Sequence, residues 1–365
     1  MDKKRTGQRI RYLRTTDGVQ MAWAETGTGP VIVVKAANWL THLEYEWESP
    51  VWQHWIRFFS EHFRYVRYDE RGCGMTDRNI TGLSFERWVA DLEEVIGAAC
   101  IDGPVALLGI SQGAAVCVAY AVRHPERVSR LLLYGGYARG VYRRGDAGAE
   151  REYQAIIELV RRGWGRDNPA FRQIFTSRFV PVGATSEQLD WFNELCHRTT
   201  SAEIAGDLMH ARAQVDVSGM LAEVQAPTLV VHSRNDAVVP IAEGRYLAAG
   251  IPGAQFVELD SANHVLLRQE PAWTRFCEVV LAFMGIEAAS PGGEDSAFGS
   301  LSRREREVLV LITEGLGNAE IGERLSISEK TVRNHVSSVF DKLGVWTRAQ
   351  AMVFARDRGF RADGR

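Results

Sequence analysis

The chain has 365 residues, of which 45% are hydrophobic and 24% charged, and its formal net charge is -3. This length favours two domains of unequal size, and this composition is typical of a soluble globular protein and excludes a polycation or a disordered chain. The charge is uneven, because residues 301–365 hold 12 Lys and Arg against 9 Asp and Glu, which leaves a net charge of +3 there and -6 in the rest. This asymmetry is typical of a chain whose C-terminal end faces nucleic acid.

The cysteines and the N-terminus indicate the compartment. Five widely spaced cysteines (Cys73, Cys100, Cys117, Cys196 and Cys277) form no disulfide framework or C-x-x-C metal motif, so we expect free thiols in a reducing environment. The charged N-terminus has no apolar stretch behind it, and no apolar run approaches the ~18 residues of a membrane helix. We therefore expect a cytoplasmic protein without membrane contact, and the sequence contains no motif for a metal or another cofactor.

The first half of the chain alternates strands and helices. Apolar and polar residues alternate over 9–24 around Thr16-Asp17-Gly18, which predicts an antiparallel hairpin. Buried strands are predicted at 31–34, 65–68, 104–108 and 128–136, with helices at 84–96 and 112–123 between them. This order predicts an α/β fold with a mostly parallel sheet that is covered on both faces.

The second half begins with a change of pattern. Helical periodicity replaces the strand signal over 149–213, strands are predicted again at 228–232 and 254–259, and an amphipathic helix is predicted at 273–284. Small, polar, Gly and Pro residues then break all periodicity. We expect a first domain at 1–286 with a helical cap at about 137–222, a linker at 287–298, and a small all-α domain at 299–365.

The segment Gly109-Ile110-Ser111-Gln112-Gly113 follows a buried strand and opens a helix. This G-x-S-x-G pattern is typical of a nucleophile elbow, although a short pattern of this kind also occurs in ordinary strand-to-helix turns. A serine nucleophile requires a base and an orienting acid. Asp236 and His264 each follow a later buried strand, in the chain order Ser, Asp, His, and the carboxyl ends of parallel strands share one edge of the sheet.

Residues 9–285 resemble the α/β-hydrolase family, both in this constellation and in two further segments. Residues 69–77 are similar to its D-x-R-G-x-G-x-S-D turn, and residues 124–128 to its H-P-x-R-V junction. The resemblance implies Ser111 as nucleophile, His264 as general base and acid, and Asp236 as the orienting carboxylate. It also implies that the backbone N–H of Gln112 is an oxyanion donor.

This chain departs from the family in the loop after the first central strand. Many members have His-Gly there, whereas this chain has Lys35-Ala36-Ala37-Asn38-Trp39, so the backbone N–H of Trp39 is the candidate second oxyanion donor. One alternative to catalysis is a hydrolase fold kept only as a ligand pocket. Seven aromatic residues are candidates either for the wall of an apolar ligand chamber or for ordinary core: Trp47, Trp52, Trp164, Phe171, Phe175, Trp191 and Phe192.

The C-terminal segment begins with Ser302 and Glu305 in capping-box spacing, which predicts a helix start. A second helix is predicted at 319–325 and a third after Ser328. On the third helix Val332, Val336, Val339 and Leu343 share the inward face, which leaves a polar stripe opposite.

Residues 301–345 match the pattern L-S-x-R-E-x-E-V-L, G-x-x-N-x-E-I, L-x-I-S-x-x-T-V-x-N-H and K-L-G-V, and closely resemble the LuxR-type helix-turn-helix. The resemblance implies double-stranded DNA as partner and a fourth helix at 347–358 for homodimerisation. It places Arg333, Asn334 and Ser337 toward the bases. It places four residues toward the DNA backbone: Lys330, Thr331, His335 and Lys342.

Two functions are consistent with this sequence. The first is a transcriptional regulator whose α/β-hydrolase domain senses a small, largely apolar ester- or lactone-like ligand, with or without hydrolysing it. The alternative is a serine hydrolase acting on ester bonds, with a complete Ser-Asp-His triad and an autoregulatory DNA-binding tail.

Overall fold

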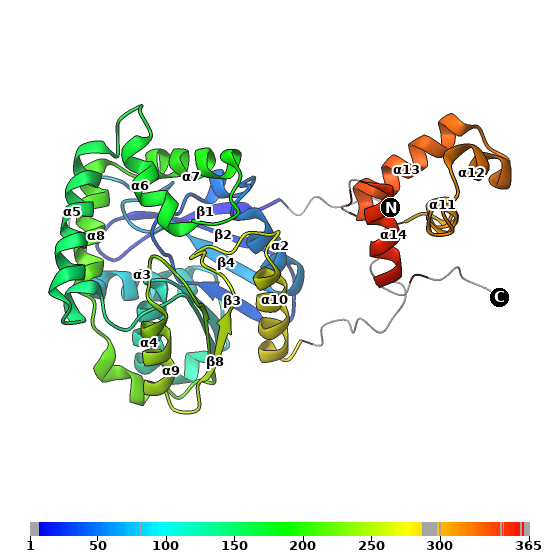
Figure 1. Cartoon of the computed structure of the whole chain (residues 1–365). Helices are drawn as coiled ribbons and strands as arrows, with labels where there is room; N and C mark the ends of the chain where they lie inside the picture. The colour runs from blue at the N-terminus through cyan, green and yellow to red at the C-terminus, as the bar shows by residue number, and fades with distance from the viewer. Residues whose placement is uncertain are drawn as a thin grey trace. The chain divides into compact units, whose positions relative to one another are not determined.

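The structure is a computed structural model, and it describes residues 7–80, 82–286, 298, 301–343, 345, 347–357 and 360. The chain divides into two compact units, residues 1–286 and residues 287–365 (Figure 1). The predicted linker at 287–298 lies outside the described residues except for Phe298, which packs in the core of the second unit.

An eight-stranded sheet forms the centre of the first unit, in the order β1-β2-β4-β3-β5-β6-β7-β8. The β1–β2 and β2–β4 pairs are antiparallel and all other neighbouring pairs are parallel, which confirms the predicted fold class. The strands are β1 (Arg9–Arg14), β2 (Gln20–Thr26), β3 (Ile32–Lys35), β4 (Arg64–Tyr68), β5 (Val105–Ile110), β6 (Val128–Tyr134), β7 (Thr228–Ser233) and β8 (Gln255–Leu259).

Helices cover both faces of this sheet because its central strands are apolar on both sides. Successive residues point to opposite faces, so that Val34 and Leu107 join the core under one set of helices and Val33 and Leu108 the core under the other. The first set is α3 (Phe85–Ala98), α4 (Gly113–Arg123) and α9 (Ile241–Gly250), and the second is α2 (Gln53–His62) and α10 (Pro271–Met284) (Figure 1). A further short helix, α1 (Leu43–Glu46), precedes α2.

Four helices occupy the segment between β6 and β7 and lie together in Figure 1. Side-chain caps fix the starts of three of them; Thr185 and Gln188, for example, form a capping box at the start of α7. Most of their apolar side chains belong to the same core as α2 and α10, whereas Leu208 of α8 joins the other core. The helices are α5 (Ala147–Gly163), α6 (Ala170–Phe179), α7 (Ser186–Thr199) and α8 (Ala202–Ala213), and we call them the cap.

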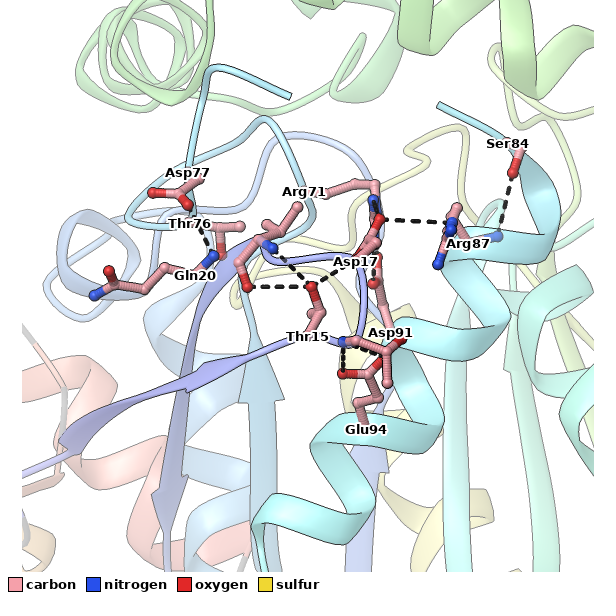
Figure 2. A network of polar contacts seen from close by, with 12 residues as sticks. Thr15, Asp17, Gln20, Arg71, Thr76, Asp77, Ser84, Arg87, Asp91 and Glu94 are labelled. Carbon is pink, nitrogen blue, oxygen red and sulfur yellow. Dashed lines mark hydrogen bonds and ion pairs between the residues drawn. The ribbon is translucent and has the colours of Figure 1, made fainter. Parts of the chain in front are cut away.

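The turn at 69–77 holds the N-terminal hairpin against α3 (Figure 2). The guanidinium of Arg71 is buried and bonds the carboxylate of Asp91 on α3 at 2.7 Å and that of Asp17 in the hairpin at 2.9 Å. Thr76 and Asp77 accept hydrogen bonds from two backbone N–H groups of the segment that begins at Gln20. Arg71, Thr76 and Asp77 of this turn are therefore structural, because they join the hairpin, the turn and α3.

The second unit is helical. Its first helix starts at a capping box in which Ser302 and Glu305 bond each other's backbone N–H groups, as the sequence predicts. Ile321, Val332 and Val339 are fully buried in its core. Its helices are α11 (Arg303–Thr313), α12 (Asn318–Leu325), α13 (Glu329–Leu343) and α14 (Arg348–Asp357).

Candidate functional site

Ser111 lies at the turn between β5 and α4, and its φ is +53°. A non-glycine residue rarely adopts this left-handed conformation, so the surrounding backbone must hold it there. Its N–H donates to the carbonyl oxygen of Tyr134 at 2.9 Å. A Cβ at Gly109 would lie 2.6 Å from Cα of Ala114, so only glycine lets the strand and the helix approach this closely. The predicted elbow geometry follows from these packing constraints.

Asp236 and His264 meet at the same edge of the sheet. Nδ1 of His264 lies 2.6 Å from Oδ2 of Asp236, and both side chains are almost fully buried. The other oxygen of Asp236 accepts from the N–H groups of Val238 and Val239 at 2.8 and 2.9 Å. Burial opposes ionisation of this carboxyl, but His264 and these N–H groups outweigh it and lower the pKa of Asp236. The carboxylate therefore stays charged and orients the imidazole.

The second ring nitrogen of His264 is available for chemistry. Nε2 is buried and has no hydrogen-bond partner among the described residues. Ser111 and His264 line the same cavity, and no hydrogen bond joins them within the described chain. Such a bond is often long in an unliganded enzyme and shortens when substrate binds. The structure thus brings the three predicted triad residues to one site, with the base free toward the cavity.

Hydrogen bonds join the cap to the loop of His264. The N–H groups of His264 and Val265 both donate to the carbonyl oxygen of Phe179, at 2.8 and 3.1 Å. The amide side chain of Asn263 bonds the N–H of Val182 at 3.0 Å and its carbonyl at 2.8 Å. These four bonds fix the end of α6 and the residues after it to the histidine loop.

The two candidate oxyanion donors also border the cavity. Gln112 and Trp39 both line it, and neither backbone N–H donates to another group in the part of the chain that the structure describes. The ring of Trp39 stacks on that of Trp164 with centroids 5.3 Å apart, and the next residue, Leu40, has a φ of +65°. This loop is therefore held in an uncommon backbone conformation without the glycine found in many hydrolases.

A buried arginine that the sequence analysis did not single out contacts the elbow from the cap. Nε of Arg212 on α8 donates to Oε1 of Gln112 at 2.6 Å, and its Nη2 pairs with the carboxylate of Glu70. The guanidinium also lies over the ring of Trp39, 5.1 Å from its centroid. Arg212, Gln112 and Glu70 are all buried. We call these three residues the arginine clamp; it joins the cap, the elbow and the loop after β4.

The cavity above Ser111 has a volume of about 160 Å³. This is close to the volume of about 150 Å³ that holds one benzene-sized molecule in an apolar protein core, so the ligand must be small. Of the seven aromatic candidates, Trp52, Phe175 and Phe192 line the cavity, and Trp164 lies behind Trp39. Further lining residues that the sequence analysis did not identify come from separate cap segments and the loop after β6: Tyr137, Arg144, Glu152, Tyr153, Arg178 and Arg212.

The predicted DNA-contacting residues lie on α13 and at its start. Lys330, Arg333, Asn334 and Ser337 are exposed, whereas Thr331 and His335 are half-buried. Ser328 caps the helix by accepting from the N–H of Thr331 at 3.1 Å. Arg333, Asn334 and Ser337 follow one another at helical spacing, so one exposed stripe of α13 carries all three groups predicted to face bases.

Lys342, near the end of α13, has a partner inside the unit. Its ammonium bonds the two carboxylate oxygens of Glu305 at 2.8 and 2.6 Å, and Ser338 bonds the same carboxylate. Burial of Glu305 raises its pKa, but these bonds outweigh that effect and lower the pKa to about 2. Lys342 thus joins α13 to α11, a contact that the sequence pattern does not reveal.

No group of three or more His, Cys, Asp and Glu side chains among the described residues could hold a metal ion. No helix in the described ranges is long and apolar enough to cross a membrane.

Comparison with known families agrees with this division of the chain. Residues 45–271, more than half of the chain, match the model of the alpha/beta hydrolase fold. The chain therefore belongs to the α/β-hydrolase family. Residues 299–355 match the model of the bacterial regulatory proteins of the luxR family, so a LuxR-type DNA-binding domain follows the hydrolase domain in the same chain.

Individual relatives match one part or the other. The chain is 24% identical over 260 residues to the AB hydrolase superfamily protein YisY of Bacillus subtilis. The match covers 71% of this chain and 94% of that protein. It is 53% identical over 60 residues to the transcriptional regulatory protein DegU of Brevibacillus brevis, which covers 16% of this chain and 25% of that protein. An esterase from Exiguobacterium antarcticum has a similar fold, with a TM-score of 0.65 at 23% identity over 76% of this chain and all of that one.

Proposed function

We propose that this protein is a transcriptional regulator whose hydrolase domain senses a small, largely apolar ligand with an ester or lactone group. The observation that carries the proposal is the presence in one chain of two features. One is a small cavity bordered by Ser111, His264 and several aromatic rings, and the other is a LuxR-type domain with an exposed polar stripe. A regulator of this kind acts where the chromosome is, so we place it in the cytoplasm.

The DNA contacts proposed for the second domain follow from its exposed groups. Arg333 and Asn334 have the fork and amide geometries that read guanine and adenine in the major groove, and Ser337 lies one turn further along the same stripe. The residues proposed to contact the backbone are Lys330, Thr331, His335 and Lys342. We further propose that the protein forms a homodimer through α14. Val353 of this helix is 46% exposed, and two DNA half-sites require two DNA-binding domains held in register.

A second candidate function is supported by the bond between Asp236 and His264 and by the constrained backbone of Ser111. In this alternative the protein is a serine hydrolase with an autoregulatory DNA-binding tail. Oγ of Ser111 attacks the ester carbonyl while Nε2 of His264 takes its proton, and the backbone N–H groups of Gln112 and Trp39 stabilise the oxyanion. His264 then returns the proton to the leaving alcohol, and a water molecule activated by the same nitrogen cleaves the acyl-serine, which releases the acid and restores Ser111.

Labelling of the full-length protein with a fluorophosphonate distinguishes the two candidates. Both a reactive and a purely sensory site bind ester ligands, but only an activated Ser111 forms the covalent phosphonyl adduct, which Ser111→Ala must lose. Rapid turnover of short acyl esters favours the enzyme, and labelling with slow or no turnover favours the sensor. An unlabelled wild-type protein would contradict any catalytic role and leave a receptor.

The DNA-binding part is tested by selecting binding sites from random DNA with the full-length protein. The double variant Arg333→Ala/Asn334→Ala should lose sequence-specific binding, because it removes both base-reading forks. Specific binding that persists in this variant would contradict the proposed reading stripe.

A further inference from the structure

Three arginines from the cap and the segment before it face one cavity. Arg144, Arg178 and Arg212 all line the cavity that contains Ser111. All three arginines also act on the phenol of Tyr153. Burial raises the pKa of Tyr153 to about 12, whereas the positive charge of each arginine favours a lower pKa. A cavity whose other walls are mostly aromatic and aliphatic therefore has one strongly polar end.

The carboxylates of the protein do not balance these cations. Arg212 pairs with Glu70, and Glu243 is shared between Arg139 at 2.9 Å and Arg144 at 3.8 Å. Arg178 donates to the carbonyl oxygen of Ala237 at 3.2 Å and has no carboxylate partner among the described residues. Glu152, at the rim, is exposed. Arg178 is thus the lining arginine without a carboxylate partner in the described chain, and Arg144 shares its single carboxylate with Arg139, which does not line the cavity.

Buried polar atoms without partners border the same space. Nη1 of Arg212 and Nε2 of Gln112 are buried donors that have no hydrogen-bond partner in the described chain, and both residues are less than one-tenth exposed. A buried donor without an acceptor is costly, so these two donors, which lie beside the elbow, favour a ligand that brings acceptor oxygens into the cavity. Guanidinium groups match a carboxylate in charge and in planar geometry.

We propose that the ligand carries a free carboxylate, held by Arg178 and Arg144 at one end of the cavity, while its ester or lactone carbonyl lies at Ser111. This inference rests on the proposed function, and it specifies that the ligand of the hydrolase domain carries a single negative charge. The apolar middle of the cavity holds the short chain between the two groups. Arg178, which has no carboxylate partner among the described residues, fits one carboxylate and does not require a dianion.

The test compares two small esters that differ at one end. Monomethyl glutarate has a carboxylate where methyl pentanoate has a methyl group, and both have the same methyl ester and chain. Binding to full-length Ser111→Ala protein is measured by calorimetry, which avoids turnover. We expect the glutarate to bind at least about 10-fold more tightly, because charge-assisted hydrogen bonds are the strong ones. Equal or tighter binding of methyl pentanoate, or binding of neither, would overturn the proposal.

Variants locate the carboxylate. In the Ser111→Ala background, Arg178→Gln/Arg144→Gln should reduce the preference to about one, whereas Arg162→Gln, an exposed arginine of the cap that does not line the cavity, should keep it. An unchanged preference in the double variant would overturn the assignment to these arginines. If the double variant fails to fold, the comparison of the two esters in the Ser111→Ala protein still tests the proposal. Fluorophosphonate labelling of Ser111 without a preference for the carboxylate would overturn this inference alone and leave the proposed function intact.

Discussion

Asp17 is a single residue whose charge holds the N-terminal hairpin to the rest of the hydrolase domain. The hydrogen bond from Arg71 lowers its pKa from 3.8 to about 2. Because the pKa is lower in the folded state, the ionised carboxylate stabilises the fold above about pH 4, and this stabilisation is lost as the pH falls from about 4 through 2.

Asp17→Asn should therefore lower the free energy of unfolding by about 1 kcal/mol at pH 7, a value reduced from the full shift because the loop is partly exposed. The difference from wild type should shrink as the pH is lowered from 5 toward 2. Urea unfolding at a series of pH values measures it, with exposed Asp102→Asn as the control. A difference that stays constant with pH would refute the assigned role of the charge.

Some residues of the site could be predicted from the sequence, whereas others were found only in the structure. Ser111, Asp236 and His264 could be predicted to share one edge of the sheet because each follows a buried strand, and a strand is a local pattern. Arg212 could not, because its contacts with Gln112 and Glu70 span 100 and 142 residues and depend on how the cap docks. A charged residue in an amphipathic helix is ordinarily expected on the solvent side.

At the scale of elements, the arginine clamp fastens α8 of the cap to the elbow. Arg212→Met should lower the free energy of unfolding by about 3–5 kcal/mol, because it leaves the carboxylate of Glu70 buried without its charge partner. Arg212→Met/Glu70→Met should regain most of this loss, because neither charge is then buried. Denaturant unfolding of the three proteins gives the comparison.

The same double variant separates positioning from stability. It should still react more slowly with a fluorophosphonate than wild type, because the side chain of Gln112 has lost its anchor beside the oxyanion donor. A double variant as unstable as the single one would argue against charge burial as the cause. Wild-type labelling rates in the double variant would show that the clamp does not position the elbow.

Two lysines of α13 should behave differently. Lys342→Gln should lower the free energy of unfolding of the DNA-binding domain by about 1–3 kcal/mol, because it removes a charged partner of the buried Glu305. Lys330→Gln should leave stability unchanged, because Lys330 is exposed, and should reduce the salt dependence of DNA affinity by about one ion. Thermal unfolding and binding at several salt concentrations measure the two effects. Equal stability of both variants would contradict the role assigned to Lys342.

Elements with clear boundary residues were the most predictable. The helix starts at Ser84 and Ser302 have the caps that the sequence predicts, and the strands of the sheet lie within a few residues of the expected ranges. The helices α2 and α9 were not predicted from the sequence. The spatial order of the strands follows from packing between distant segments, and no local pattern contains it.

For the whole molecule, a sensor requires the two domains to influence each other. If the ligand changes the affinity for DNA by some factor, then DNA must change the affinity for the ligand by the same factor. We expect at least about a 5-fold effect in both directions, within the usual range of coupling. DNA binding with and without monomethyl glutarate, and calorimetry of the glutarate with and without a selected DNA site, measure the two factors in Ser111→Ala protein.

The variant Arg333→Ala/Asn334→Ala is the control for this coupling, because the DNA site should then have no effect on ligand affinity. If the ligand leaves the affinity for DNA unchanged and DNA leaves the affinity for the ligand unchanged, the domains act independently. This result would favour the hydrolase with a separate DNA-binding tail. Unequal factors would show that one of the two measurements is not at equilibrium.

The four hydrogen bonds between the cap and the histidine loop also restrict how a ligand can enter and leave the cavity. Raising the cap at Phe179 and Val182 would pull His264 out of line with Asp236, so this edge must stay shut while the site is intact. Ligand exchange is then left to the side of the cavity bordered by α5, where Glu152 is exposed. A ligand that leaves by that side does so without disturbing the bond between Asp236 and His264.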